Sequence, residues 1–439
     1  MKKTMQRREF LKTLGFGSAG LLLPGSLLAD TNSGTYKPEG VPGATGASGN
    51  VIVIGGGMGG AAVAKYLRLW GGTNVKVTLI ERNPNYVSNI LSNEVLTGQK
   101  TLANLTFTYA NLAKNYGITV LQDEVTTIDP AARKVTTASG KTLGYDRLVI
   151  SPGIEFDVIP GLETPEAQAA VPHAWKAGAQ TTALRNQIAA MPAGGVFVLT
   201  IPAAPYRCPP GPYERACMVA DYLKRNKPGS KVIVLDANAA ITAGKTNFTY
   251  AFNTIHAGVI DYRPASTVLA IDAANRTLDT NWGKIQADVI NAIPPQRAGR
   301  IIADTGLNNA NGRWAGVDVL SYESTVSGAN GIHVIGDSSA TTQPKAGHVA
   351  TQEARVCADA IVRALKGQAP DPAPMTNSAC YSPITSTTAS WLSVVYAYDA
   401  ASKSMKPVGG TATEAASISS KNFSQMEQWF QSLMQETFS

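Results

Sequence analysis

The chain has 439 residues, of which 44% are hydrophobic and 16% are charged. This is an ordinary globular composition, and the length allows two or three domains. The formal net charge is +7, but no basic run follows the N-terminal segment, which argues against nucleic-acid binding. Beyond that segment no stretch reaches about 18 uninterrupted apolar residues, so we expect no membrane span in the mature chain.

The N-terminal segment, residues 1–29, has the layout of an export signal. Basic residues come first, a short apolar run broken by glycines follows, and the small residue Ala29 closes it. The run R-R-E-F-L-K, which begins at Arg7, resembles a twin-arginine signal and predicts export of the folded protein to the periplasm. A general secretory signal or an uncleaved anchor is the alternative. Residues 30–49 are rich in Gly, Ser, Thr and Pro and are expected to form a flexible arm.

The clearest motif begins with the apolar strand V-I-V-I at residues 51–54. It runs into G-G-G-M-G-G, which supplies the G-x-G-x-x-G pattern at Gly55, Gly57 and Gly60. A helical segment and a second strand follow, and this strand ends at Glu81, 21 residues after the last glycine. Such a context is typical of dinucleotide binding. The glycines let a pyrophosphate approach the backbone at a helix N-terminus, and Glu81 can accept hydrogen bonds from a ribose.

Two further motifs indicate which dinucleotide binds. Y-D-R-L-V-I-S-P-G at residues 145–153 is a strand that enters a turn, and G-I-H-V-I-G-D at residues 331–337 is a strand that ends in Gly-Asp before a helix over about 349–365. Both resemble motifs of two-dinucleotide-binding flavoproteins, in which the Gly-Asp carboxylate binds the ribityl chain of FAD. Taken alone, Asp337 would be better explained as a helix cap. The candidate cofactor-binding residues are Gly55, Gly57, Met58, Gly60, Glu81, Arg82, Asn93, Val125, Gly153, Gly336 and Asp337.

A second nucleotide-binding layout begins with the strand at residues 194–205. A helix over about 213–224 and a strand that ends at Asp236 complete it. Its turn reads P-A-A-P-Y-R-C-P-P-G-P-Y-E in place of the glycine fingerprint. Proline has no N–H to offer a phosphate, and Cβ atoms block close approach to the backbone. We therefore expect no NADH site here, and we expect the loop to hold Cys208 toward the flavin instead.

These stretches together resemble the flavoprotein subunit of flavocytochrome c sulfide dehydrogenase, in the sulfide:quinone reductase-like group, over nearly the whole mature chain. The resemblance implies an α/β fold with two Rossmann-like dinucleotide-binding domains, the second degenerate, and a C-terminal α+β domain that carries the partner interface. The expected boundaries are 50–170 with 295–365 for the FAD domain, 171–294 for the degenerate domain and 366–439 for the C-terminal domain. The matching stretches are V-I-V-I-G-G-G-M-G-G-A-A-V-A-K-Y, Y-V-S-N-I-L-S-N-E-V, P-H-A-W-K-A-G, P-A-A-P-Y-R-C-P-P-G-P-Y-E-R-A, I-N-A-I-P-P-Q-R-A-G and G-I-H-V-I-G-D.

The resemblance also implies a reaction. Hydrosulfide attacks a disulfide near the flavin, a persulfide forms, and the released thiolate passes two electrons to FAD. Single electrons then leave for a c-type haem, which belongs to a separate cytochrome subunit because this chain has no C-x-x-C-H.

Two positions depart from the family pattern. The family's flavin-linking cysteine is Asn89 here, so we expect FAD to be bound non-covalently. We match the family's second redox cysteine, which follows the Gly-Asp pair, to Ser339. The usual disulfide with Cys208 is therefore not expected to form.

Three interpretations of Cys208 remain open: a free thiol or persulfide carrier, a disulfide with Cys217, or another arrangement. A position near an oxidised flavin and a helix N-terminus predicts a lowered pKa of its thiol. Glu214 is a candidate acid/base group beside it, or equally a carboxylate that complements the helix dipole. Cys217, Cys357 and Cys380 are expected to be buried and unreactive, although Cys380, in S-A-C-Y-S, lies at a position that resembles the family.

The four histidines are widely spaced and form no metal-ligand pattern, so we predict no metal site. His348, at the start of a helix, is a weak candidate for proton handling. Three functions compete. We favour a periplasmic FAD-dependent oxidoreductase that oxidises sulfide or a related small sulfur compound and reduces a c-type cytochrome. The others are an electron relay without efficient sulfide oxidation, and a non-catalytic partner of a sulfur-oxidising complex.

Overall fold

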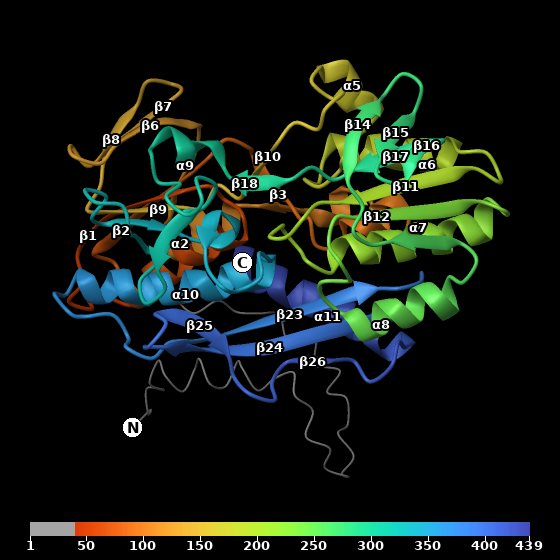
Figure 1. Ribbon diagram of the computed structural model, residues 1–439. Coiled ribbons are helices and arrows are strands. Elements are labelled where there is room, and N and C mark those ends of the chain that lie inside the picture. Colours follow the sequence, from red (N-terminus) through yellow and green to blue (C-terminus); the bar gives the residue numbers. More distant parts are fainter. Residues whose placement is uncertain (1–39) are drawn as a thin grey trace, which may run out of the picture.

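A computed structural model describes residues 40–439 (Figure 1). The predicted signal segment, residues 1–29, and the first part of the predicted arm lie outside the described residues. Helices and sheets alternate along the described chain, which confirms the predicted α/β fold class. Within residues 40–439, no helix combines the length and the apolar character needed to cross a bilayer.

The first unit is built on an eight-stranded sheet with the order β22-β19-β20-β21-β9-β1-β2-β5. Its central strand β1 pairs in parallel with β2 and β9, and β21 joins the far side of β9 in parallel, as a doubly wound sheet requires. The eight strands are β1 (Gly49–Ile54), β2 (Val75–Glu81), β5 (Thr119–Gln122), β9 (Arg147–Ile150), β19 (Ala315–Asp318), β20 (Glu323–Ser324), β21 (Ile332–Val334) and β22 (Ser339–Ala340).

Two helices, α2 (Met58–Gly71) and α10 (Gly347–Ala364), pack together against this sheet. Ala61 and Ala64 on α2 and Ala354 on α10 are buried in the same apolar cluster as the β1 side chains, so small residues let the helices approach closely. The predicted strand–turn–helix–strand motif and the predicted helix over about 349–365, which is α10, are thereby confirmed. Smaller elements follow β2 and β5: β3 (Asn85–Val87), α3 (Ser92–Leu96), η1 (Ala103–Leu105), β4 (Thr106–Thr108), α4 (Ala110–Tyr116), β6 (Val125–Asp129), β7 (Lys134–Thr137) and β8 (Thr142–Gly144).

The second unit contains a four-stranded parallel sheet with the order β13-β12-β11-β17. The chain enters this unit through β10 and leaves it through β18, and these two strands pair antiparallel as a double connection to the first unit. The elements of this part of the chain are β10 (Ile154–Phe156), α5 (Pro165–Ala170), α6 (Ala179–Ala190), β11 (Val196–Ile201), α7 (Gly211–Asn226), β12 (Lys231–Asp236), α8 (Lys245–Tyr250), η2 (Ala251–Ile255), β13 (Ile260–Arg263), β14 (Val268–Asp272), β15 (Thr277–Thr280), β16 (Gly283–Gln286), β17 (Val289–Ala292) and β18 (Gln296–Ala298). Helix α9 (Arg300–Asp304) follows β18, and η3 (Gly336–Ser338) lies between β21 and β22 of the first sheet.

The C-terminal part of the chain lies beneath both units in Figure 1. It consists of an antiparallel sheet and one long helix, and Lys65 of α2 donates a 2.6 Å hydrogen bond to the carbonyl of Glu436 in that helix. Its elements are β23 (Met375–Pro383), β24 (Ala389–Asp399), β25 (Ser404–Pro407), β26 (Thr413–Glu414) and α11 (Ser420–Phe438).

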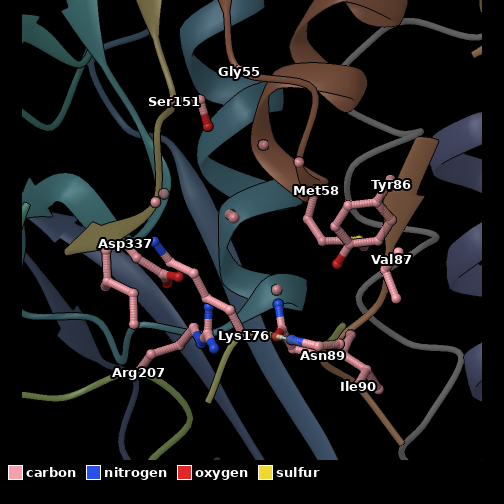
Figure 2. A pocket seen from close by; sticks show the side chains of 18 of the residues that line it. Gly55, Met58, Tyr86, Val87, Asn89, Ile90, Ser151, Lys176, Arg207 and Asp337 are labelled. Atoms are coloured by element: carbon pink, nitrogen blue, oxygen red, sulfur yellow. Dashed lines mark hydrogen bonds between the residues drawn. The ribbon is translucent and has the colours of Figure 1, made fainter. Parts of the chain in front are cut away.

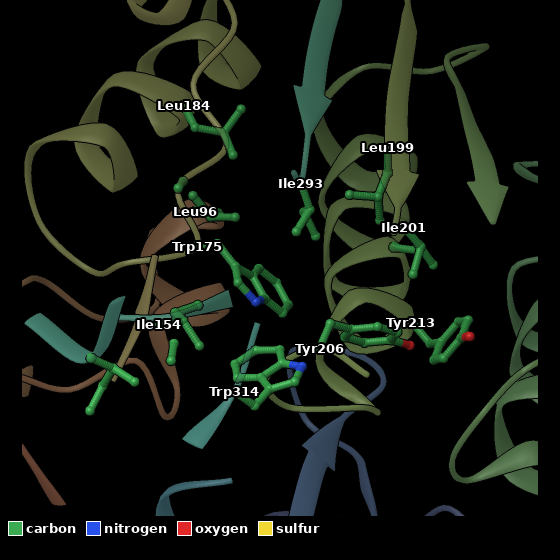
Figure 3. Close-up of a cluster of buried hydrophobic side chains, with 14 of the residues drawn as sticks. Leu96, Ile154, Trp175, Leu184, Leu199, Ile201, Tyr206, Tyr213, Ile293 and Trp314 are labelled. Atoms are coloured by element: carbon green, nitrogen blue, oxygen red, sulfur yellow. The ribbon is translucent and has the colours of Figure 1, made fainter. Parts of the chain in front are cut away.

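One apolar core runs through both nucleotide-binding units. Figure 3 shows Trp175 and Trp314 with Ile154 of the β10–β18 connection on one side and Leu199 of β11 on the other. Because the units share this core, they form a fixed frame for the cavity between them.

Candidate active site

A cavity of about 850 Å³ lies where the first sheet, the second unit and the C-terminal sheet meet. Its size is within the range of cofactor pockets. It is lined by every candidate cofactor-binding residue except Gly60, and by both candidate catalytic residues, Cys208 and Glu214. Figure 2 shows Asp337 on one side of this cavity and Met58 on the other.

The glycines of the turn after β1 have different structural roles. Gly55 has a φ of +94°, and a Cβ there would lie 2.4 Å from the carbonyl oxygen of Ser151. A Cβ on Gly60 would lie 1.8 Å from the carbonyl oxygen of Gly55, so this glycine allows helix α2 to pack on the turn. Gly57 lines the cavity, and a Cβ there would meet nothing within 4 Å. Only Gly57 therefore leaves open space for a phosphate next to the backbone.

The carboxylate of Glu81 braces the same turn. Its Oε2 accepts a 2.7 Å hydrogen bond from the N–H of Gly56, and its Oε1 accepts one of 2.8 Å from the N–H of Asn83. Because each carboxylate oxygen can accept more than one bond, Glu81 can still bind a ribose. Arg82 is largely exposed at the edge of the cavity and pairs with Glu124 across 3.2 Å.

Asp337 follows β21 at the floor of the cavity. Its Oδ1 is buried and accepts no hydrogen bond from any residue between 40 and 439. Burial raises the pKa of Asp337, and the charges of Arg207 and Lys345 act in the opposite direction. A buried carboxylate oxygen without a donor suits a polyol hydroxyl. The glycine turn, Glu81 and Asp337 therefore fit the pyrophosphate, ribose and ribityl parts of FAD.

Cys208 is held rigidly in front of helix α7. Its backbone has a left-handed φ of +56°, which is uncommon outside glycine. Its N–H donates a 2.7 Å hydrogen bond to the carbonyl of Lys345, and its carbonyl accepts one of 2.8 Å from the N–H of Gly211. These bonds fix the backbone on both sides of the thiol, which borders the cavity.

The pKa of the Cys208 thiol is raised, not lowered. Burial raises it well above the usual value, Cys380 and Glu214 add to the rise, and the charge of Arg207 lowers it. The prediction of a lowered pKa for Cys208 is therefore wrong when the protein's own groups are considered. Desolvation of the thiol outweighs the nearby positive charge of Arg207.

Cys380, on strand β23, lines the same cavity as Cys208. The two thiols interact electrostatically, since Cys380 raises the pKa of Cys208. Burial, followed by the charge of Glu214, raises the pKa of Cys380 itself to about 12. The structure thus brings two thiols and one carboxyl group to one wall, and the expectation that Cys380 is an inert buried residue is wrong on position.

The hydroxyl of Ser339 is engaged by neighbouring protein groups. Ser339 is buried, does not line the large cavity, and donates a 2.8 Å hydrogen bond to the carbonyl of Gly336 and a 3.3 Å bond to Glu353. The family's second redox cysteine is matched to Ser339 in the sequence, but the thiol that lines the same cavity as Cys208 is Cys380. The stretch S-A-C-Y-S was the signal that identified it.

All four cysteines are free thiols in the structure. The alternative disulfide between Cys208 and Cys217 is absent, and Cys217 is fully buried in α7. Cys357 is fully buried in α10, so the expectation of a buried position is confirmed for these two residues.

Glu214 lies in the first turn of α7 and faces the two thiols. Its Oε1 accepts a 2.7 Å hydrogen bond from Nδ2 of Asn93. Burial raises the pKa of Glu214 to about 8, hydrogen bonds from Asn93 and Ser382 oppose the rise, and the charge of Glu94 adds to it. A carboxyl group with this pKa can gain and lose a proton near neutral pH, as acid/base catalysis requires.

Arg215 orders the wall behind Glu214, a role that no motif in the sequence indicates. Its Nε donates a 2.8 Å hydrogen bond to Oδ1 of Asn93, and its Nη1 donates 2.9 Å bonds to Oδ1 of Asn291 and the carbonyl of His173. Asn93, a candidate cofactor-binding residue, thus uses both ends of its amide to connect Arg215 to Glu214. Its side chain orients the carboxyl group.

Asn89 lines the cavity, and its Oδ1 accepts a 2.7 Å hydrogen bond from the N–H of Ala177. Figure 2 shows it on the same side as Ile90. The amide therefore anchors the neighbouring loop at the position where the family pattern has a cysteine.

The ribose-binding position of the second unit is occupied by protein groups. Asp236, at the end of β12, is fully buried, and its Oδ2 accepts 2.8 Å hydrogen bonds from the hydroxyls of Tyr213 and Tyr262. Its Oδ1 accepts 2.9 Å and 2.8 Å bonds from the N–H and side chain of Asn238. Each oxygen of Asp236 already accepts two hydrogen bonds, so no lone pair remains for a ribose hydroxyl, which supports the expectation that NADH does not bind here.

His348 lines the cavity as a neutral side chain. Its Nδ1 accepts a 3.0 Å hydrogen bond from the N–H of Ala379, and burial, with the charge of Arg355, lowers its pKa to about 4. A role in proton transfer near neutral pH is not supported by this pKa. Within the described part of the chain, no group of three or more His, Cys, Asp or Glu side chains could hold a metal ion.

Three family models match successive parts of the chain. The model described as pyridine nucleotide-disulphide oxidoreductase matches residues 49–189. The model of the central part of the sulfide dehydrogenase (flavocytochrome c) flavoprotein chain matches residues 181–294. The model of the flavin-binding part of flavocytochrome c sulphide dehydrogenase matches residues 372–438.

Individual relatives agree with these models. A sulfide-quinone reductase of Aquifex aeolicus is 36% identical over 104 residues, which cover 24% of this chain and 24% of the relative. A mitochondrial sulfide:quinone oxidoreductase of Dictyostelium discoideum is 26% identical over 192 residues, which cover 43% of this chain and 42% of the relative. The matched stretches thus span less than half of either relative.

The fold agrees over a greater length. The crystal structure of the Aquifex aeolicus sulfide:quinone oxidoreductase superimposes with a TM-score of 0.71 and 18% identity, over 89% of this chain and 92% of that chain. At this identity the similarity shows the fold alone. The two sulfide dehydrogenase models and the sulfide–quinone reductase relatives support a flavoprotein similar to those of flavocytochrome c sulfide dehydrogenase and of the sulfide:quinone reductases.

Proposed function

We propose that this protein is an FAD-dependent oxidoreductase that oxidises sulfide, or a related small sulfur compound, through Cys208 and Cys380. The observation that carries the proposal is that both thiols and Glu214 line one cavity whose remaining walls fit FAD. The two sulfide dehydrogenase models support the same chemistry. The two curated relatives are named as sulfide–quinone oxidoreductases, which supports sulfide as the substrate.

Different residues of the chain carry out the sulfur chemistry and the proton uptake. In the oxidised enzyme Cys208 and Cys380 form a disulfide, and hydrosulfide breaks this S–S bond, forms a persulfide on one cysteine and leaves a thiolate on the other. A second hydrosulfide removes the added sulfur as hydrogen disulfide and leaves both cysteines as thiolates. Re-formation of the Cys208–Cys380 disulfide releases two electrons, which a bound FAD would accept. In total, two HS⁻ give one HSS⁻, one proton and two electrons. Glu214 takes up the proton beside the thiols.

We further propose that FAD is bound non-covalently, because Asn89 cannot form a thioether with the flavin. The electron acceptor is a c-type cytochrome on a separate chain, as the name of the flavocytochrome c family suggests. The N-terminal R-R-E-F-L-K run supports a periplasmic location reached by the twin-arginine route.

Anaerobic stopped-flow spectroscopy of the holoprotein with sulfide tests the proposal. We expect rapid bleaching of the flavin absorption band, and we expect Cys208→Ser and Cys380→Ser each to abolish it. Cys217→Ala, which changes a buried thiol outside the cavity, is the matched control and should bleach like the parent. Added cytochrome c should then be reduced only when sulfide is present.

A flavin that stays oxidised in the parent would exclude sulfide as the substrate and would favour the electron-relay function. Bleaching that survives in Cys380→Ser but not in Cys208→Ser would restore a one-cysteine mechanism. The two variants therefore separate the three outcomes.

A further inference from the structure

Two cations in the wall of the cavity have no counter-charge of their own. The Lys and Arg side chains that line the cavity are Arg82, Lys176, Arg207, Arg215 and Arg300. Arg82 and Arg300 form ion pairs, and Arg215 donates hydrogen bonds to two amides. The side chains of Lys176 and Arg207 have neither an ion pair nor a hydrogen-bond acceptor among residues 40–439. Partly buried positive charges without an acceptor favour the binding of an anion.

Lys176 and Arg207 are anchored on the same residue pair of the double connection between the two units. Nζ of Lys176 lies 5.3 Å from the centroid of the Phe156 ring. The N–H of Arg207 donates a 2.8 Å hydrogen bond to Oε1 of Gln296. Phe156 on β10 and Gln296 on β18 are paired directly across the two strands. The two cations thus reach the cavity from one place in the fold, and Figure 2 shows both side chains in its lining.

This place adjoins the thiol of Cys208. Arg207 directly precedes Cys208 in the chain, and Trp175 directly precedes Lys176. One point, where a Cβ on Gly211 would stand, lies 2.9 Å from Sγ of Cys208 and 3.0 Å from Cη2 of Trp175. The indole edge and the thiol are therefore packed close together, and the two cations follow from the segments that carry them. Both cations lie beside the sulfur atom at which the substrate reacts.

The phosphates of FAD do not account for these charges. The glycine turn that suits the pyrophosphate belongs to the first unit, between β1 and α2. Lys176 and Arg207 belong to the second unit, in the loops before α6 and α7. The anions that the proposed reaction brings to this part of the cavity are sulfur species, since both hydrosulfide and hydrogen disulfide carry a negative charge.

We propose that Lys176 and Arg207 form a binding site for the small sulfur anion that reacts at Cys208, hydrosulfide on entry and hydrogen disulfide before release. The site selects anionic sulfur compounds over neutral thiols, because only an anion gains from two cations without a counter-charge. The identity of the anion rests on the proposed function. The capacity to hold a small anion depends on the two cations alone.

The proton affinities of both side chains agree with a missing counter-charge. Burial lowers the pKa of Lys176, Glu155 opposes this shift, and the charges of Arg207 and Arg82 add to it. Burial also lowers the pKa of Arg207, and the charge of Asp337 opposes that shift. A bound anion would raise both pKa values and would keep both side chains charged.

Calorimetric titration of the holoprotein with thiocyanate, a small sulfur-containing anion that does not reduce flavins, tests the site directly. We expect one thiocyanate to bind per protein. Lys176→Met and Arg207→Gln should each weaken this binding about tenfold or more, the effect of losing one hydrogen bond to a charged group. No binding to the parent would overturn the site.

Two further variants serve as controls. Lys176→Arg keeps the positive charge and should bind thiocyanate like the parent. Arg300→Gln removes a cavity-lining cation that already pairs with Asp304, and it should also bind like the parent. FAD content and melting temperature are measured for each variant. Loss of FAD from both Lys176→Met and Arg207→Gln would assign the cations to the cofactor and would reject the anion site.

Anaerobic stopped-flow spectroscopy with sulfide tests the identity of the anion. In Lys176→Met the sulfide concentration that gives half the limiting bleaching rate should rise about tenfold or more, while the limiting rate stays near that of the parent. Arg207→Gln should also lower the limiting rate, since the charge of Arg207 lowers the pKa of Cys208. Flavin reduction by a photochemical electron donor needs no sulfur anion and should be unchanged in both variants.

The two experiments separate failure of the anion site from failure of the proposed function. Thiocyanate binding that depends on Lys176 and Arg207, in a parent whose flavin sulfide does not reduce, would keep the anion site and reject the proposed function. Bleaching at parental sulfide concentrations in variants that no longer bind thiocyanate would keep the proposed function and reject the sulfur anion as the ligand of this site.

Discussion

Nδ2 of Asn93 donates a 2.7 Å hydrogen bond to Glu214, while Oδ1 of the same amide accepts a 2.8 Å hydrogen bond from Arg215. One amide thus fixes the carboxyl group that faces both thiols. The guanidinium fixes which end of the amide faces Glu214, because only the oxygen of Asn93 can accept from Arg215.

Replacing Asn93 by Ala should raise the pKa of Glu214 by about one unit, because the lost hydrogen bond stabilises the carboxylate. The alkaline limb of the pH profile for flavin reduction should shift upward by the same amount. Unfolding should become easier by about 1–3 kcal/mol, since Nε of the buried Arg215 loses its acceptor. An unchanged pH limb would show that Glu214 does not control the rate.

The Glu214→Gln variant tests the pKa through stability. In the native state Glu214 has a pKa of about 8, above the ordinary glutamate value of 4.5, so it holds a proton that the unfolded chain has already lost. Its contribution to stability is therefore present below about pH 4.5 and is lost as the pH rises through about 8, with a limiting slope of about 1.4 kcal/mol per pH unit. Denaturant unfolding between pH 5 and 8 should show a shallower decline for Glu214→Gln than for the parent. Parallel declines would contradict the raised pKa.

Gly60 and Gly57 offer a matched pair of substitutions. Gly60→Ala should lower the free energy of unfolding by about 3 kcal/mol or more, because its Cβ would lie 1.8 Å from the carbonyl oxygen of Gly55. Gly57→Ala should fold within about 0.5 kcal/mol of the parent, since its Cβ meets nothing within 4 Å. It should nevertheless bind FAD at least about tenfold more weakly. Equal FAD affinity in Gly57→Ala and the parent would move the pyrophosphate away from this turn.

Asp337→Ala should have opposite effects on stability and binding. The apoprotein should gain about 1 kcal/mol or more, because a buried carboxylate oxygen without a partner is removed. Affinity for FAD should fall by about one to two orders of magnitude, the value of one hydrogen bond to a charged group. Isothermal titration of apoprotein with FAD, beside denaturant unfolding, measures both. A loss in both quantities would indicate that Asp337 serves the fold instead.

Asn89→Cys should install a covalent flavin. The side chain borders the cavity at the position where the family pattern has the flavin-linking cysteine. After acid precipitation, yellow pigment should remain with the variant and leave the parent. Asn89→Ser, which has a similar size and cannot form a thioether, should release its flavin like the parent. Release of the flavin from both Asn89→Cys and Asn89→Ser would show that the reactive edge of the flavin ring does not lie next to residue 89.

The parts of the fold that follow local rules could be predicted from the sequence. The turn at Gly55 requires a positive φ, and the packing at Gly60 leaves no room for a Cβ, so the glycine pattern specifies the strand, turn and helix around it. The loss of the glycine pattern before Cys208 is also visible locally, and the structure engages Asp236 of the second unit with the hydroxyls of Tyr213 and Tyr262. These features depend on residues close together in the chain.

Which thiol lines the same cavity as Cys208 depends on contacts distant in the chain, which a local motif does not specify. Ser339 follows Asp337 closely, but the 3₁₀ turn directs its hydroxyl to the carbonyl of Gly336 and away from the cavity. Cys380 reaches the cavity from strand β23 of the C-terminal sheet, and the placement of that sheet is set by packing of α11 and α10. The pKa of Cys208 was mispredicted for a similar reason, since burial is a property of the assembled fold.

The order of synthesis has a consequence for how this protein acquires its cofactor. The glycine turn leaves the ribosome well before Cys380 and Trp429, which line the same cavity. A nascent chain that has not yet reached these residues can therefore offer FAD only an open half-site. Stable retention of the cofactor must wait until the C-terminal sheet and helix α11 have been made, so FAD occupancy reports that these distant segments have folded together.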